Sequence, residues 1–246
     1  MNRWIPILVS LVMLIGASTG AATLTFDVET GLVFSGYNDV RIPGDTGTLF
    51  SLSEELDIDP TSFFRIRILY ALGRRHSLGL LLAPLRLESG GTLDRTLMYQ
   101  DQEFAPFTEL KARYRFDSYR LTYRYAIRTG HPLEAGLGVT AKIRDASIRV
   151  EGDGRRSEKK NTGFVPLINF RLRWMTTEQI GLLLEGDALA APQGRAEDVL
   201  LALYYQPSER VGMKVGYRLL EGGADNDEVY NFTLLHYLAA GAMVTF

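Results

Sequence analysis

The chain has 246 residues, of which 46% are hydrophobic and 23% charged, and its formal net charge is −2. This length is enough for a single domain, and the small negative charge argues against a nucleic-acid partner, which normally needs a large positive excess. The absence of cysteine excludes disulfides, thiol chemistry and a lipid-anchoring cysteine. No motif for a metal ion or another cofactor is present, so we expect none.

The first 22 residues have the layout of a secretory signal peptide. Arg3 supplies a positive charge, Trp4 to Ile15 form a short apolar core, and the small residues that follow end at Ala22, the expected cleavage position. An uncleaved anchor helix is the alternative, but the apolar core is short for a helix that spans a membrane. The sequence therefore predicts an exported mature domain at residues 23–246.

After residue 22 the apolar residues recur with a period of two, which is typical of strands with two different faces. In the first segment Leu24, Phe26 and Val28 alternate with Thr25 and Asp27. The same alternation marks residues 64–72, 119–128, 133–144, 164–174, 180–187 and 211–219. Two segments, 77–87 and 199–206, are apolar on both faces and are interpreted as strands from their length and context.

The connections between these segments alternate between short and long. Short turns are expected at residues 73–76, 129–132, 176–179 and 207–210. Longer polar connections are expected near residues 38–61, 88–106, 151–162, 192–196 and 221–228. The count is about ten antiparallel strands, with eight as the alternative if two of the less regular segments are loops.

The C-terminal segment is the most specific local signal. From Tyr230 its apolar residues keep one parity up to the final Phe246, and only His236 interrupts them. Here the sequence resembles the small outer-membrane β-barrel proteins of Gram-negative bacteria, which commonly end in an alternating strand with a terminal aromatic residue. The resemblance is one of pattern over residues 23–246, without a subfamily motif. It implies an all-β, transmembrane, antiparallel up-and-down β-barrel in the outer membrane, and a barrel-assembly machinery that recognises Phe246.

A soluble exported β-barrel that binds an apolar ligand is the rival architecture, because it shows the same alternation with the apolar face inward. Three features favour the membrane barrel instead: the signal peptide, the terminal Phe246, and aromatic residues near the ends of predicted strands. These aromatic residues are Phe63, Tyr125, Trp174, Tyr217 and Tyr230.

If the apolar face meets lipid, the opposite face lines the barrel interior and is rich in charge. Charges in a narrow barrel must be paired or hydrated, since unpaired burial is costly. An ion-pair network that fills the interior is the first interpretation, and a narrow pore that prefers anions is the second. The charged residues expected to line the lumen are Asp27, Glu29, Arg65, Arg67, Arg120, Arg124, Arg128, Lys142, Arg144, Arg171, Arg173, Glu185, Asp187, Lys214 and Arg218.

An enzyme that acts on lipid A or phospholipid is an alternative function. Barrel enzymes of this kind mostly place a histidine beside a serine or carboxylate, because imidazole transfers protons near neutral pH. His76 and His131 lie in short turns, which outer-membrane barrels have on the periplasmic side, and His236 has no such neighbour close in sequence. We therefore expect no catalytic residue and favour a structural barrel or a narrow pore.

The expected partners are outer-membrane lipid and lipopolysaccharide, and the assembly machinery during biogenesis. A basic loop near the predicted outer rim, formed by Arg155, Arg156, Lys159 and Lys160, is suited to contact lipopolysaccharide phosphates. The acidic stretches at residues 54–59 and 225–228 lack the spacing of a calcium loop and are interpreted as solvated loop acids.

Overall fold

The computed structural model describes residues 22–191 and 194–246, so the predicted signal peptide lies outside the described residues except for Ala22. No helix in these two ranges is long and apolar enough to cross a membrane. The strands are β1 (Thr23–Arg41), β2 (Phe50–Ser51), β3 (Asp57–Ile58), β4 (Thr61–Leu72), β5 (His76–Ala83), β6 (Arg86–Thr92), β7 (Leu97–Tyr99), β8 (Gln102–Phe104), β9 (Glu109–Arg128), β10 (Leu133–Gly152), β11 (Arg155–Met175), β12 (Ile180–Ala191), β13 (Gly194–Ser208), β14 (Val211–Asp225) and β15 (Tyr230–Thr245).

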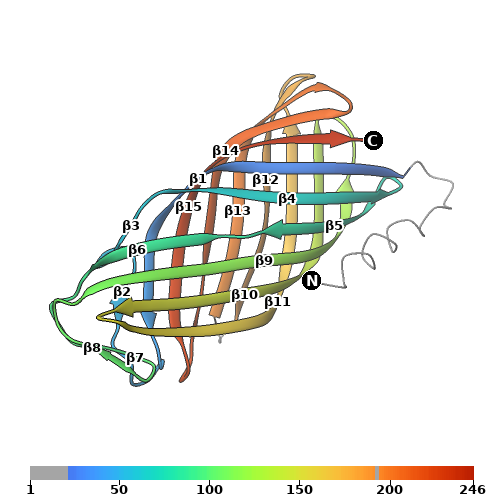
Figure 1. Cartoon of the computed structure of the whole chain (residues 1–246). Helices are drawn as coiled ribbons and strands as arrows, with labels where there is room; N and C mark the ends of the chain where they lie inside the picture. Colours follow the sequence, from blue (N-terminus) through green and yellow to red (C-terminus); the bar gives the residue numbers. More distant parts are fainter. Residues whose placement is uncertain (1–21, 192–193) are drawn as a thin grey trace, which may run out of the picture.

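The long strands close into one antiparallel barrel (Figure 1). Each is paired with its neighbours in the chain, and closure comes from β1, which pairs with both β15 and β4. β5 and β6 both pair with β9 and act as one strand interrupted after Ala83. The barrel therefore has ten strands, which confirms the predicted fold class and count. The eight-stranded alternative is wrong because both doubly apolar segments, residues 77–87 and 199–206, belong to the barrel wall.

The outward face of the barrel carries a belt of exposed apolar side chains. On β1 the belt includes Phe26 and Leu32; at about 3.3 Å per residue and a tilt of about 40°, the stretch from Leu24 to Phe34 rises about 25 Å, the height of a hydrocarbon layer. An apolar belt of this height around a closed sheet is stable only in lipid. Other belt residues are Phe64, Ile66, Tyr119, Leu121, Val139, Ile143, Ile168, Leu172, Leu201, Leu203, Val215 and Leu238.

The barrel continues well beyond this belt on one side. A transmembrane strand needs about 9–11 residues, whereas β9 and β10 each have 20. Above the belt the outward positions of β9 become charged at Lys111, Arg113 and Arg115. The start of β1 and the C-terminus lie at the opposite end from the β7–β8 hairpin (Figure 1). Outer-membrane barrels have short turns at the periplasmic end and longer loops at the extracellular end. The end with the long strands and the β7–β8 hairpin is therefore the extracellular part.

Three of the predicted long connections are wrong in extent. β13 already begins at Gly194 and β14 runs on to Asp225, so the connections expected at residues 192–196 and 221–228 are partly strand. Residues 151–162 were expected to form a long loop, but β10 and β11 run on to a tight turn at Asp153 and Gly154, whose φ angles are +49° and +71°. Two consecutive positive φ angles are typical of a two-residue hairpin turn. The hydrophobic alternation is absent there because the outward side chains, such as Arg149 and Glu158, face water instead of lipid.

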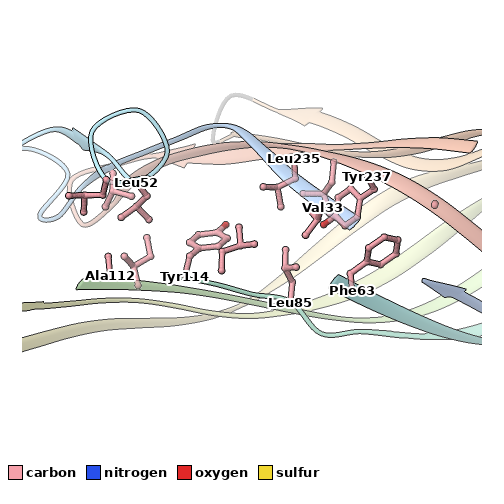
Figure 2. Close-up of a cluster of buried hydrophobic side chains, with 14 of the residues drawn as sticks. Val33, Leu52, Phe63, Leu85, Ala112, Tyr114, Leu235 and Tyr237 are labelled. Atoms are coloured by element: carbon pink, nitrogen blue, oxygen red, sulfur yellow. The ribbon is translucent and has the colours of Figure 1, made fainter. Parts of the chain in front are cut away.

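The interior of the extracellular half is apolar. Val33, Leu235 and Tyr237 from β1 and β15 point into the barrel, toward Tyr114 on β9 (Figure 2). Phe63 comes from β4, the strand that pairs with β1, and packs in the same core. Phe63 was predicted to lie near a strand end, and it is the third residue of β4. Its side chain points inward, and its ring meets that of Tyr237 edge to face, with centroids 4.8 Å apart. β5 and β13 are apolar on both faces for another reason: their inward residues Leu81 and Leu200 are buried at the level of the membrane, where they stand opposite charged residues such as Arg67 and Glu185.

Two connections, residues 42–60 and 93–108, fold together into an extracellular cap over this core. The backbone N–H of Gln100 donates to the carbonyl of Ile42 (2.8 Å), and the Tyr99 hydroxyl donates to the carbonyl of Ile148 on β10 (2.7 Å). Glu55 ties the two segments together, because its carboxylate accepts hydrogen bonds from Arg95 (2.6 and 3.0 Å) and from the Ser51 amide (2.8 Å).

We predict that Phe63→Ala destabilises the folded barrel by about 3–5 kcal/mol, because it leaves a cavity in the interior core. The measurement is urea unfolding of the protein refolded in detergent. The control is Phe64→Ala, since Phe64 is 49% exposed on the lipid face whereas Phe63 is 5% exposed. Equal losses for the two variants would contradict an apolar interior at this level.

The cap is expected to lose protection in acid. The Arg95 hydrogen bonds hold the pKa of the Glu55 carboxyl below its usual value, with a smaller contribution from the Ser51 amide. A lowered pKa in the folded state stabilises the cap above the ordinary glutamate pKa, and this stabilisation is lost as the pH falls through the lowered value. Glu55→Gln should therefore speed amide exchange of residues 51–56 at neutral pH and remove its acid dependence. Glu54→Gln, at an exposed neighbour, serves as the control and should change neither.

Candidate functional site

The centre of the membrane part is a buried ion-pair network around Asp198. Its carboxylate accepts hydrogen bonds from Arg65 (2.8 Å), Arg120 (2.6 Å) and Arg218 (2.5 Å), which come from β4, β9 and β14. All four side chains are at most 5% exposed. A single carboxylate on β13 thus joins strands from opposite sides of the barrel.

Four further carboxylates extend the network. Glu29 binds Arg218 through two hydrogen bonds (2.7 and 2.8 Å), and Lys214 lies 2.9 Å from Asp27 and 3.1 Å from Glu29. Glu185 accepts from Arg67 at 2.8 Å. The fifth acid, Asp187, accepts from Arg120 (2.7 Å) and from the neutral side chains of Thr140 (2.6 Å) and Asn169 (2.7 Å).

The balance of charge explains why this network is tolerated in a barrel interior. Five carboxylates meet six cations (Arg65, Arg67, Arg120, Arg171, Lys214 and Arg218), and each acid has at least one partner within 2.9 Å. Buried charges without partners would cost several kcal/mol each. The paired side chains come from β1, β4, β9, β11, β12, β13 and β14 and meet in the interior at the level of the membrane.

The remaining predicted lumen residues lie at the two ends of this network. At the periplasmic end, Arg124, Arg128 and Arg173 line an open recess of about 380 Å³ together with Arg171 of the network, and Arg173 donates to Glu134 at 2.5 Å. At the extracellular end, Lys142 and Arg144 line a second cavity of about 470 Å³. The predicted lumen residues outside the network are thus divided between two separate recesses.

Sequence reasoning missed Asp198, which accepts hydrogen bonds from three arginines. It lies just before a segment that is apolar on both faces, where no parity could be assigned. The signal that could have found it is its register: Asp198 pairs with Asp187 across β12 and β13, and Asp187 was already predicted to face the interior.

The histidines lie away from the network, and so do the cations of the predicted basic loop, which the structure places on the β10–β11 hairpin. The ring of His236 hydrogen-bonds the hydroxyl of Tyr217 on the outer wall, and His76 Nδ1 lies 2.8 Å from the Tyr123 hydroxyl near a periplasmic turn. In the described ranges no histidine hydrogen-bonds a serine or a carboxylate. Of the hairpin cations, Arg156 and Lys160 lie near Glu158, Lys159 bonds Glu228, and Arg155 donates to the carbonyl of Glu103.

A closed ten-stranded barrel with an apolar outer belt and paired charges inside defines the chain as a transmembrane β-barrel of the outer membrane. The structure is similar to that of the outer membrane protease OmpT from Escherichia coli, with a TM-score of 0.60 and 11% identity over 91% of this chain and 97% of that one. At this identity the similarity shows the fold alone. The attachment invasion locus protein Ail of Yersinia pestis matches with a TM-score of 0.43 and 11% identity, over 91% of this chain and 99% of that one. No protein-family model matches the sequence, and no curated protein matches it.

We predict that Asp198→Ala lowers the free energy of unfolding by about 3–5 kcal/mol, because it leaves three buried guanidinium groups without their shared acceptor. The measurement is urea unfolding followed by Trp174 fluorescence. The matched control is Glu197→Ala, which removes the neighbouring, half-buried acid and should cost less than about 1 kcal/mol. A small effect at Asp198 would mean that water or another group replaces its contacts at little cost.

Proposed function

We propose that this protein is an outer-membrane barrel with an occluded lumen, a rigid scaffold that presents an extracellular recess, and that it does not act as a diffusion pore. The observation that carries this proposal is the contact of Asp198 with Arg65, Arg120 and Arg218, which links opposite walls with almost no exposed surface. An ion crossing the barrel would have to displace paired charges, which is costly in a low-dielectric interior.

The two recesses support the same proposal. In the described part of the chain, the periplasmic recess and the extracellular cavity have no lining residue in common. The apolar core and the cap add a second barrier on the extracellular side. The excess of arginine that suggested an anion-preferring pore is concentrated in the periplasmic recess, which ends at the network.

The test is single-channel recording in a planar bilayer, with a general-diffusion porin as the positive control. We expect the wild-type protein to insert without steady conductance. The double variant Asp198→Ala/Arg218→Ala keeps the net charge but removes the central contact. We expect this variant to conduct, because water fills the space that the two side chains occupied.

A matched control is Glu88→Ala/Arg113→Ala, which removes an ion pair of 2.6 Å on the exposed outer surface and should leave the barrel closed. Steady, anion-selective conductance of the wild-type protein would overturn the proposal and favour the narrow pore.

A further inference from the structure

The ladder between β11 and β12 is incomplete in the extracellular half of the barrel wall. The ladder between β11 and β12 runs from the pair Met175 and Gly181 to the pair Ile168 and Ala188, and stops there. Both strands continue, β11 back to Arg155 and β12 on to Ala191. Pro166 stands just past the last pair, and proline has no N–H with which to continue a ladder. The wall therefore has a lateral gap between β11 and β12.

The extracellular cavity lies behind this gap. Its lining includes Phe164 and Pro166, which are exposed on the outer face, and Val165 and Leu189, which face inward. Because one cavity touches both faces of the wall, the gap connects the outer surface with the interior. The volume, about 470 Å³, is within the range of small-molecule sites, and a second cavity of about 380 Å³ adjoins it.

The inner end of the cavity holds a cation without an acid. Lys142 is 4% exposed, and its ammonium lies 4.8 Å from the centroid of the Phe116 ring. No carboxylate of the described residues lies within ion-pair distance of it, whereas Lys214 has three. A buried ammonium in this position is stabilised by an anion that enters the cavity.

The position of the gap indicates where such an anion comes from. Phe164 pairs with Ile143, an outward belt residue, and the next outward residues toward the hairpin tip, Thr162 and Lys160, are polar and exposed. The gap therefore opens at the border between hydrocarbon and headgroups. A molecule arriving there from the outer leaflet has an apolar chain, and the aromatic and aliphatic walls of the gap suit that chain.

We propose that this cavity binds a single-chain anionic amphiphile of the fatty-carboxylate class, with the carboxylate on Lys142 and the chain leading out through the gap beside Phe164 and Pro166. The proposal rests on the proposed function in one respect, since the occluding network forms the floor below Lys142. It assigns a ligand class to the extracellular recess.

The test uses the purified barrel in phosphatidylcholine nanodiscs and isothermal titration calorimetry with dodecanoate, with protein-free nanodiscs subtracted. We expect saturable binding to the wild-type protein and at least tenfold weaker binding to Lys142→Met. This variant removes an unpaired buried charge, so it should fold with unchanged heat modifiability on gels. Lys160→Met, on the outward face of the same hairpin, is the control and should bind within twofold of the wild type.

Two further arms separate charge from shape. Dodecan-1-ol, which has the same chain without the charge, should bind at least tenfold more weakly than dodecanoate, and Leu189→Trp, which fills the cavity, should weaken dodecanoate binding. Equal affinity for the alcohol, or no effect of Lys142→Met, would overturn the carboxylate site. Inorganic phosphate binding as tightly as dodecanoate would show a free-anion site and overturn the amphiphile. A folded protein that does not bind dodecanoate would also overturn it.

The conductance of the same preparation distinguishes the two proposals. A barrel that binds dodecanoate but conducts keeps the ligand site and refutes the occluded lumen. A barrel that neither conducts nor binds dodecanoate supports the occluded lumen and refutes the ligand site.

Discussion

The structure depends on the pairing of charges inside a closed barrel. A transmembrane barrel satisfies its backbone through ladders between neighbouring strands, so what remains to be satisfied is the inward row of side chains. In this protein five carboxylates and six cations occupy that row at the level of the membrane, and Asp198 contacts arginines from three other strands. The contacts with Arg65 on β4 and Arg120 on β9 join strands that share no ladder with β13, and they brace the wall from inside.

The interior changes character along the barrel axis. Within the lipid belt it is ionic, and above the belt it is apolar, with Val33, Phe63 and Tyr114 packed as in a soluble protein (Figure 2). The outer surface changes in the opposite sense, from apolar in the belt to charged above it. The extracellular half is thus a water-soluble barrel joined to a membrane barrel through the same strands, which explains why β9 and β10 are about twice as long as a bilayer requires.

The incomplete ladder between β11 and β12 lies beside the cavity to which we assign a ligand. A complete ladder between β11 and β12 would seal the interior, but the pairing ends at Ile168 and Pro166 follows. Lys142 lies behind this interruption without an acid, although a well-paired network lies next to it. The contrast with Lys214, which has three carboxylates within 3.6 Å, indicates that the missing partner of Lys142 is a feature of the cavity and does not reflect a shortage of acids in the barrel.

The sequence by itself determined the barrel: alternation with a period of two, from Leu24 on β1 to Phe246, distinguishes a lipid face from an inward face, because successive side chains of a strand point to opposite sides. It also identified most of the inward charges. It did not determine which charges meet, since Asp198 and Arg65 are 133 residues apart and come together only through strand register and barrel closure. It also did not reveal the apolar core, because above the belt the apolar side chains face inward and the outward ones face water. The gap beside Pro166 was decided by tertiary structure as well, since a proline marks where a ladder can stop, but only the course of the neighbouring strand determines whether the wall opens there.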